Sequence, residues 1–453
     1  MLDFFSSARS KDEAPKATAS VQSLSGSQLS GNEPRSEHEQ LEKAEDEKKK
    51  KKGILSLLFA RPFTRRRIII LSALGFLIVA ILVLVITLPI VLTRAHKRKD
   101  PGDVYRLYPT KHEDPSYRIL ENKPVYAIHN FPDPGLLHHN GTWYAYGTNP
   151  HKRDPQSIHV PVATSTDFVN WTLHEGYDAM PTLGDWEVAQ NHWAPDVIER
   201  DDGKFVLYYS GQTNNFNKHH CIGAAVSNGT NPLGPYIPLN ESLACPHEYG
   251  GAIDPSPFRD ADGKLYVVYK GDGNSVGSGG WCGNSIKPLR PVPLILQELE
   301  SDGITKVGEP EIILNINDTD GPLIEAPNII RQDDGTYYLF FSSHCFTSLG
   351  YNVKYAHAKS VKGPYTRVDR PLLQTNDFGL KAPGGATLSH DGTKIVFHAN
   401  CDGYRCMYVG GVDIRSTNNT IIMAALEIVS TVSSNSTNTT TTTNTTSIAD
   451  SSQ

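Results

Sequence analysis

The first 52 residues contain no aromatic side chain after Phe5 and are rich in Ser, Glu and Lys. A segment with so little apolar surface cannot offset the conformational entropy that folding removes. The rest of the chain lacks helical periodicity outside one apolar run, which argues against a helical bundle. We therefore expect residues 1–67 to be a disordered tail and the folded part to be built from strands.

The one apolar run, residues 68–93, has 26 residues and no charge. At about 1.5 Å per helical residue it exceeds the roughly 30 Å hydrocarbon core of a bilayer, which predicts a transmembrane helix. A cleaved signal peptide is the alternative, although its apolar core would be shorter and nearer the N-terminus. Nine basic residues lie within residues 48–67, just before the run, and four follow it within residues 94–99. The tail is therefore expected in the cytoplasm, with residues 94–124 as a stalk or linker.

Cysteines and glycosylation sequons are absent before this run and frequent after it. All six cysteines lie from Cys221 onward, an even number typical of disulfides in an oxidising compartment. The sequons lie at Asn140, Asn170, Asn228, Asn240, Asn317, Asn418, Asn435, Asn438 and Asn444. Together they predict a single-pass type II membrane glycoprotein whose main domain is extracellular or in a secretory lumen.

The cysteine positions also suggest a disulfide pattern. Cys401 and Cys406 are close enough in sequence to bridge one loop, and Cys221 with Cys245 is the next choice. These two pairs leave Cys282 with Cys345. Other pairings remain open, because sequence spacing alone does not fix connectivity.

Positive charge is scarce beyond the apolar run. Residues 1–99 carry a net charge of +8, which leaves −14 for residues 100–453, because the whole chain carries −6. An acidic main domain argues against nucleic acid as a partner. Asp260-x-Asp262 and Asp318-x-Asp320 are similar to the metal motif of glycosyltransferases, but both lie in turn sequences with no α/β pattern around them.

A turn followed by a strand-like run occurs five times. Each copy has Asn-Gly or Asp-Gly before a run such as DGKFVLYYS, which predicts a hairpin turn entering a β-strand. The glycines are Gly141, Gly203, Gly263, Gly335 and Gly392, at spacings of 62, 60, 72 and 57 residues. Such a repeat suits one four-stranded sheet per copy. We expect an all-β, five-bladed β-propeller over residues 125–425, with a β-sandwich as the alternative, and a disordered Ser/Thr/Asn-rich tail over residues 426–453.

Carboxylates recur upstream of four of the five turns, where the innermost strand of each blade would begin. They are Asp133 in FPDPGLL, Asp196 in HWAPDVI, Asp254 in IDPSPF and Glu325 in EAPNII. Any one of them could simply close a turn through its side chain, and Asp196 is the weakest candidate. A five-fold arrangement would nevertheless bring at least three to one end of the axis. Two carboxylates there suit glycoside hydrolysis, in which one protonates the leaving oxygen and the other activates water.

These motifs resemble glycoside hydrolase family 43, a family of five-bladed propellers, over roughly residues 125–415. The resemblance implies that Asp133 is the general base, that Glu325 is the general acid, and that Asp254 orients this acid and tunes its protonation. The WAP segment implies that His192 and Trp193 bind substrate. The implied protein is a monomeric, inverting hydrolase of arabinose- or xylose-containing oligo- or polysaccharides. A catalytically inactive, glycan-binding propeller is the alternative from another class.

The same resemblance implies an ion site but no cofactor for the chemistry. His398 in IVFHANCD matches a blade-five histidine that in the family commonly faces a water-coordinated ion, often calcium. A histidine on an alternating strand can equally be a satisfied core residue. Calcium prefers oxygen ligands, so waters would have to complete the shell of such an ion.

Overall fold

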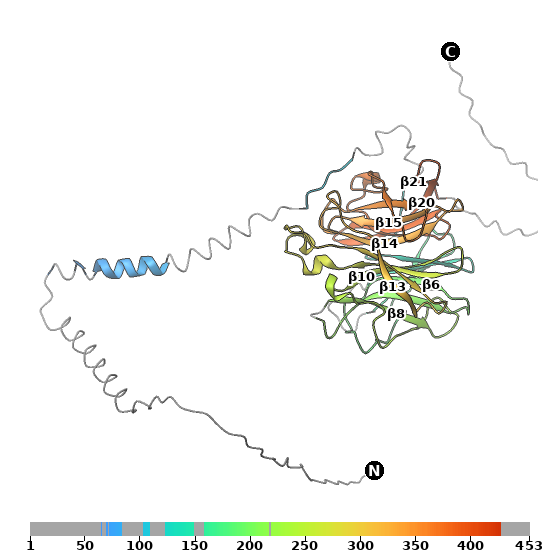
Figure 1. Cartoon of the computed structure of the whole chain (residues 1–453), viewed down its shortest axis with the longest axis horizontal. Coiled ribbons are helices and arrows are strands. Elements are labelled where there is room, and N and C mark those ends of the chain that lie inside the picture. The colour runs from blue at the N-terminus through green and yellow to red at the C-terminus, as the bar shows by residue number, and fades with distance from the viewer. Residues whose placement is uncertain are drawn as a thin grey trace, which may run out of the picture. The chain divides into compact units, whose positions relative to one another are not determined.

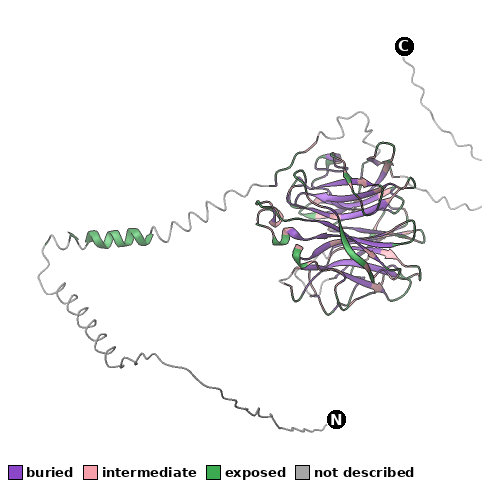
Figure 2. Cartoon of the chain, viewed as in Figure 1, coloured by how far each residue is buried: buried purple, intermediate pink, exposed green. Residues whose placement is uncertain are grey.

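The computed structural model describes residues 65, 69–70, 72–83, 103–108, 123–148, 158–216 and 219–426. The chain divides into two units, Met1–Ala95 and His96–Gln453. In the first unit, residues 72–83 are helical and exposed (Figure 2). None of the helices in the described ranges combines the length and the apolar character needed to cross a bilayer. Residues 68, 71 and 84–93 of the predicted transmembrane segment lie outside those ranges, as do most of the tail 1–67 and residues 427–453.

The second unit is a five-bladed β-propeller, which confirms the predicted architecture (Figure 1). Blade 1 contains β2 (Gly135–His139), β3 (Thr142–Tyr146), β4 (Val162–Ser165) and β5 (Thr172–Leu173). Blade 2 contains β6 (Trp193–Glu199), β7 (Phe205–Gln212), β8 (His220–Ser227) and β9 (Tyr236–Pro238). Blade 3 contains β10 (Ala252–Arg259), β11 (Leu265–Gly271), β12 (Leu294–Leu299) and β13 (Lys306–Leu314).

The remaining two blades complete the ring. Blade 4 contains β14 (Ile324–Arg331), β15 (Tyr337–Ser343), β16 (Asn352–Ala358) and β17 (Thr366–Arg367). Blade 5 contains β18 (Gly384–Leu388), β19 (Lys394–Cys401), β20 (Tyr404–Arg415), β21 (Thr420–Ala424) and β1 (Val125–Ile128). The 3₁₀ segments are η2 (His247–Tyr249), η3 (Gly273–Val276), η4 (Trp281–Gly283) and η5 (Asp377–Gly379).

Blade 5 combines the first and the last strands of the propeller. One half of β20 pairs with β1, where Val409 lies opposite Val125, and the other half pairs with β21, where Gly411 lies opposite Ala424. Hydrogen bonds between the two ends of the propeller sequence therefore close the ring. Closure of this kind leaves no long unpaired inner edge in the circle of blades.

Each predicted glycine turn joins the first and second strands of a blade. In blade 1 both Asn140 and Gly141 have positive φ, at 49° and 73°. Two successive positive φ angles are the geometry of the tight hairpin turn that Asn-Gly favours. The glycines of the other four turns also have positive φ, so the repeat seen in the sequence is a repeat of hairpins.

The hydrophobic core consists of five clusters, one between each pair of neighbouring blades. Tyr146 and Phe205 belong to the cluster between blades 1 and 2, and Phe340 and Phe397 to that between blades 4 and 5; all four are fully buried. Full burial of one large apolar side chain contributes roughly 1.5–3 kcal/mol. The blades therefore support one another through face-to-face packing, and Figure 2 shows this buried layer along the strands.

Part of the predicted stalk packs on blade 4. Asp103 Oδ1 lies 2.9 Å from His344 Nδ1, and the backbone N–H of Cys345 donates to Asp103 Oδ2 at 3.0 Å. A few residues later, the N–H of Tyr108 donates to Gln374 Oε1 at 3.0 Å. Residues 103–108 are thus part of the propeller surface and not a free linker.

The structure contains all three disulfides in the expected pairing: Cys221–Cys245, Cys282–Cys345 and Cys401–Cys406. The second joins the long loop of blade 3 to blade 4. The third closes the hairpin between β19 and β20, which carries a residue of the candidate site.

Candidate active site

Each inner strand has a residue in the left-handed backbone region near its start: two residues before the strand in blade 1, and at its second or third residue in the other four blades. The φ angles are 52° at Asp133, 44° at Ala194, 58° at Asp254, 51° at Ala326 and 58° at Gly385. All five residues line one small cavity, of about 30 Å³, on the propeller axis. Positive φ is costly for a residue with a side chain, so its recurrence marks a backbone constraint at the axis. We call these five residues the axial turn residues.

A ring of hydrogen bonds ties the axial turn residues to the preceding blades. The N–H of Ala194 donates to Thr148 Oγ1 at 2.9 Å, and that of Asp254 donates to Ser210 Oγ at 2.9 Å. The N–H of Ala326 donates to Asp254 Oδ2 at 3.0 Å, and that of Gly385 donates to Ser342 Oγ at 2.9 Å. The N–H of Asp133 donates to His398 Nδ1 at 3.2 Å. Each of the five blade interfaces therefore has one such bond. The ring fixes the axial backbone from both sides and so places the side chains that point into the cavity.

The four carboxylates found upstream of the turns do not occupy equivalent positions in their blades. Asp133 and Asp254 are axial turn residues, but Ala194 and Ala326 hold the equivalent places in blades 2 and 4. Glu325 therefore stands one residue before its axial turn residue. Asp196 stands two residues after Ala194, farther along its strand, so it cannot occupy the place of Asp133 or Asp254.

Asp133 is held as a carboxylate by three partners. Arg405 Nη1 lies 2.8 Å and His398 Nδ1 lies 3.2 Å from Asp133 Oδ1, while Thr148 Oγ1 donates to Oδ2 at 2.6 Å. Burial acts in the opposite direction, but these charges and hydrogen bonds hold the pKa of Asp133 well below its usual range. Asp133 is therefore ionised at neutral pH and can accept a proton.

Blade 5 has no carboxylate at its axial turn because the site leaves no room there. A Cβ atom on Gly385 would lie 2.6 Å from His398 Nδ1 and 3.1 Å from Asp133 Oδ1. The glycine thus makes space for the histidine and carboxylate beside it, and it adopts φ 58° without a side-chain penalty.

The second group of carboxylates surrounds a buried lysine. Lys270 Nζ lies 3.1 Å from Glu325 Oε2 and 3.4 Å from Asp272 Oδ1, and Lys270 is fully buried. Asp254 accepts the N–H of Ala326, the residue after Glu325. Burial and the charge of Glu325 raise the pKa of Asp254 to about 8. The carboxyl of Asp254 is therefore mostly protonated at neutral pH.

Asp196 belongs to a hydrogen-bonded belt across the inner strands. Its Oδ1 accepts the N–H groups of Leu136 at 3.2 Å and Val197 at 3.0 Å, and Ser256 Oγ donates to its Oδ2 at 2.8 Å. Asn328 continues the belt from Ser256 in blade 3 to blade 5. Burial raises the pKa of Asp196 to about 7. Asp196 lines the axial cavity, but its hydrogen bonds connect strands.

The two predicted substrate-binding residues, His192 and Trp193, have different surroundings. His192 is 1% exposed, its Nε2 lies 3.1 Å from Glu187 Oε2, and it is not among the residues that line the axial cavity. Trp193 is half-buried and stacks on His220 with ring centroids 3.7 Å apart. Trp193 directly precedes Ala194, so it holds in blade 2 the place that Glu325 holds in blade 4.

The two ring nitrogens of His398 differ: Nδ1 belongs to the ring of hydrogen bonds around the axis, and Nε2 does not. Its Nε2 is buried and has no hydrogen-bond partner among the described residues. Burial and the charge of Arg405 lower the pKa of His398, so the imidazole is neutral at pH 7. The neutral ring has two tautomers. When Nδ1 accepts the N–H of Asp133, Nε2 carries the proton and can donate to a water; when Nδ1–H instead donates to Asp133 Oδ1, that backbone hydrogen bond is absent and Nε2 keeps a lone pair that can bind an ion.

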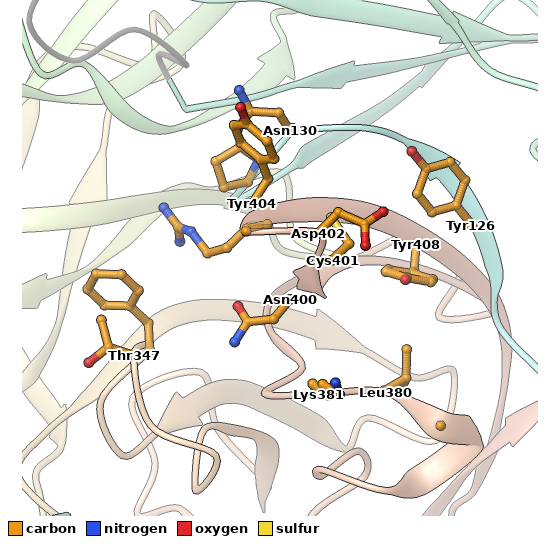
Figure 3. A pocket seen from close by; sticks show the side chains of 15 residues that line it. Tyr126, Asn130, Thr347, Leu380, Lys381, Asn400, Cys401, Asp402, Tyr404 and Tyr408 are labelled. Carbon is orange, nitrogen blue, oxygen red and sulfur yellow. The ribbon is translucent and has the colours of Figure 1, made fainter.

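A larger cavity, of about 790 Å³, opens beside the axial one over blades 4, 5 and 1 (Figure 3). Arg405 lines this side pocket and also contacts Asp133, so the guanidinium connects the two spaces. Phe346 packs under Arg405, with the guanidinium 5.0 Å from the ring centroid. Tyr404 is 51% exposed at the pocket and contacts His129 by its edge. Exposed aromatic rings among polar groups suit the apolar faces and hydroxyls of sugars.

Sequence reasoning missed Arg405, Lys270 and Thr148. A signal for two of them exists: Thr148 and Lys270 each follow their hairpin glycine by seven residues, as Ser210 and Ser342 also do. Arg405 had no such signal, because its position in the short loop between Cys401 and Cys406 says nothing about contact with blade 1.

Comparisons with known proteins agree with this site. The sequence profile of the family described as "Glycosyl hydrolases family 43" matches residues 122–411. The chain is 25% identical over 289 residues to "Extracellular endo-alpha-(1->5)-L-arabinanase 2" of Bacillus subtilis, covering 58% of this chain and 55% of that protein. It is 27% identical over 281 residues to "Beta-D-galactofuranosidase xynD" of Aspergillus niger, covering 59% of this chain and 73% of that protein.

A likeness to solved structures supports the fold alone. The "Crystal structure of a thermostable family-43 glycoside hydrolase" superposes with a TM-score of 0.54 at 24% identity, over 67% of this chain and 96% of that one. The chain spans little more than half the length of the Bacillus relative.

Proposed function

The chain belongs to glycosyl hydrolase family 43, and we propose that it is an inverting glycoside hydrolase acting on arabinose- or xylose-containing glycans. One observation supports this above the others. A carboxylate held ionised, Asp133, and a carboxyl held protonated, Asp254, line the same axial cavity, and Glu325 directly precedes the axial turn residue Ala326. Acid and base forms are thus present together at neutral pH, as hydrolysis of a glycosidic bond requires.

In the proposed reaction, Asp133 takes a proton from a water molecule as the water oxygen attacks the anomeric carbon. Glu325 gives its proton to the glycosidic oxygen as the bond between carbon and that oxygen breaks. The product sugar has the opposite anomeric configuration, and exchange with solvent restores both carboxyl groups. Inversion implies a carboxyl separation of roughly 6.5–9.5 Å in the substrate complex, which leaves room for the water.

Asp254 and Arg405 have supporting roles in this scheme. Asp254 fixes the backbone beside Glu325 through the N–H of Ala326, and burial and the charge of Glu325 raise the pKa of Asp254 itself to about 8. Arg405 neutralises Asp133 before substrate arrives and is placed to contact a sugar hydroxyl between the two cavities. No cofactor is needed for these steps.

We propose arabinose as the first sugar to test, because the Bacillus relative is named an arabinanase. Xylose follows from the family resemblance, and galactofuranose from the name of the Aspergillus relative. The axial cavity is small, about 30 Å³, whereas the side pocket, about 790 Å³, has room for more than one sugar. We therefore propose that the substrate is an oligo- or polysaccharide.

The test is hydrolysis of a panel of arabino-, xylo- and galactofuranosyl oligosaccharides, with NMR of the first product anomer. Asp133→Asn and Glu325→Gln should each lose at least about 100-fold in kcat/KM, since each removes one proton-transfer group. Glu311→Gln is the matched control, because Glu311 is an exposed carboxylate paired with Lys362 on the outer strand β13. Equal behaviour of all four proteins would favour a glycan-binding propeller, and retention of configuration would exclude the inverting mechanism.

We propose His398 as the ligand of an ion on the axis. The neutral imidazole with an unpartnered buried Nε2 fits one bond to a cation or to its water shell. Such an ion would supply a fixed positive charge near the substrate. Isothermal titration of the parent and of His398→Gln with Ca²⁺ tests the assignment, which fails if both proteins bind equally.

We further propose that the N-terminal apolar segment anchors the enzyme to a membrane, with the propeller in the secretory lumen or outside the cell. The helical residues 72–83 expose Leu, Ile, Val and Phe side chains by 52–82%, and a helix that is apolar on all sides is stable in lipid and not in water. The six described sequon asparagines are all exposed, and three disulfides are formed. Endoglycosidase digestion and carbonate extraction of membranes test the two halves of this proposal.

A further inference from the structure

The buried lysine beside Glu325 breaks the repeat of the hydrogen-bonded ring. In the second strand of blades 2 to 5, one residue lies opposite the residue before the axial turn. The registers pair Ser210 with Trp193, Lys270 with Ile253, Ser342 with Glu325 and His398 with Gly384. Ser210, Ser342 and His398 each accept an axial N–H group, and Thr148 does so in blade 1. Blade 3 has a lysine at this place, and an ammonium cannot accept a hydrogen bond.

The lysine changes what its neighbours do. Since Lys270 cannot accept the N–H of Ala326, the carboxyl of Asp254 accepts it instead. The lysine instead points its ammonium at Glu325, with Asp272 on its other side. Every charged group that faces Lys270 is therefore a carboxylate, from β10, from β14 and from the residue after β11. One buried cation stands among three acids, two of which belong to the proposed catalytic group.

We propose that Lys270 is a positioning residue of the active site, which holds the carboxyl of Glu325 in place and sets the upper pH limit at which that carboxyl can donate a proton. This inference rests on the proposed hydrolase function. Its physical basis is the 3.1 Å ion pair in a fully buried place, where a neighbouring cation favours the ionised form of a carboxyl group. Lys270 thus has two effects: it holds the carboxyl of Glu325 in one position, and it limits proton donation by that carboxyl at high pH.

The decisive substitution is Lys270→Met, which keeps the length and apolar stem of the side chain and removes its charge. Lys354→Met is the matched control. Lys354 is also buried and lies 3.0 Å from Asp320, but it belongs to blade 4 and Asp320 keeps Arg367 as a partner. Lys270→Met/Asp272→Asn removes one charge of each sign and is the variant to use if the single substitution does not fold.

The first measurement is the pH dependence of kcat/KM on an oligosaccharide, whose poor leaving group needs the acid. For Lys270→Met the basic limb should move up by about 1–3 pH units, and the optimum rate should fall about 10- to 100-fold because the acid is less well held. The double variant should show a smaller shift in the same direction. Lys354→Met should keep the basic limb of the parent. Basic limbs that coincide in parent, single and double variants overturn the proposal.

The second measurement needs no substrate, so it separates failure of this proposal from failure of the hydrolase assignment. Melting temperatures are compared at pH 5 and pH 8. Without the cation, the buried carboxyls of Lys270→Met bind protons more tightly when folded than when unfolded, so its deficit should grow as pH rises. The deficit of Lys354→Met should stay nearly constant. A deficit of Lys270→Met that is the same at both pH values contradicts the role assigned to Lys270, whatever the substrate panel shows.

Discussion

Replacing Asp196 by Asn should stabilise the protein above neutral pH, although the aspartate makes three hydrogen bonds. The carboxyl is 5% exposed, and burial raises its pKa to about 7. In the unfolded chain the pKa is about 3.9. The folded state therefore binds this proton more tightly than the unfolded chain does. The stability that protonation of Asp196 contributes is fully present below about pH 4 and is lost as the pH rises to about 7.

The size of the effect follows from the shift. One pKa unit corresponds to about 1.4 kcal/mol, so a shift of about three units is worth about 4 kcal/mol as an upper figure. Asn cannot ionise and can imitate the protonated acid. Its Oδ1 can accept the N–H groups of Leu136 and Val197, and its Nδ2 can donate to Ser256 Oγ. An imperfect hydrogen bond would reduce the gain by about 1 kcal/mol.

The assay is urea denaturation of the parent and Asp196→Asn at pH 5 and pH 8. We expect the free energy of unfolding of the Asn variant, relative to the parent, to rise by about 1–4 kcal/mol between the two pH values. Asp196→Ala is the control, because it leaves two backbone donors unpaired and should be less stable than the parent at both values. If Asp196→Asn is destabilised equally at pH 5 and pH 8, the carboxyl is ionised throughout and the reasoning is wrong.

Three further predictions concern the hairpin of blade 5. Arg405→Met should lower kcat/KM at least about tenfold and shift the acidic limb of the pH profile upward, because the cation that favours ionised Asp133 is lost; an unchanged acidic limb in a kinetic pH titration would contradict this. The double substitution Cys401→Ser/Cys406→Ser should raise KM severalfold with a small change in melting temperature, since the bridge closes only a short loop around Arg405. Steady-state kinetics in which kcat falls and KM is unchanged would contradict this prediction. Tyr404→Ala should weaken hydrolysis of long oligosaccharides several-fold and leave aryl monoglycosides unaffected, and equal losses on both substrate classes would exclude the side pocket as a sugar site.

The sequence carried the architecture because the architecture repeats. Five Asn-Gly or Asp-Gly turns at nearly equal spacing indicate five hairpins, and each hairpin requires a positive φ that glycine supplies locally. The identity of Asp133, Asp254 and Glu325 as candidates followed from the same repeat. Their register did not, because Ala194-Pro195 and Ala326-Pro327, and not the nearby carboxylates, mark the equivalent positions of Asp133-Pro134 and Asp254-Pro255.

Two kinds of contact were beyond the sequence. His192 directly precedes Trp193 and the start of β6, but the structure pairs it with buried Glu187. Arg405 reaches Asp133 from a distance of 272 residues along the chain. Only closure of the ring by blade 5 brings those two residues together.

The sequence by itself determined the number of blades, the cysteines available for disulfides and the candidate acids, since periodicity, cysteine count and residue type are local or countable properties. The tertiary structure decided that Asp133 is held ionised and that Asp254 is held protonated. Those states depend on burial and on the charges of Arg405 beside Asp133 and of Glu325 beside Asp254. Electrostatic interactions act through space, and the chain brings these charges to the carboxyls only by folding.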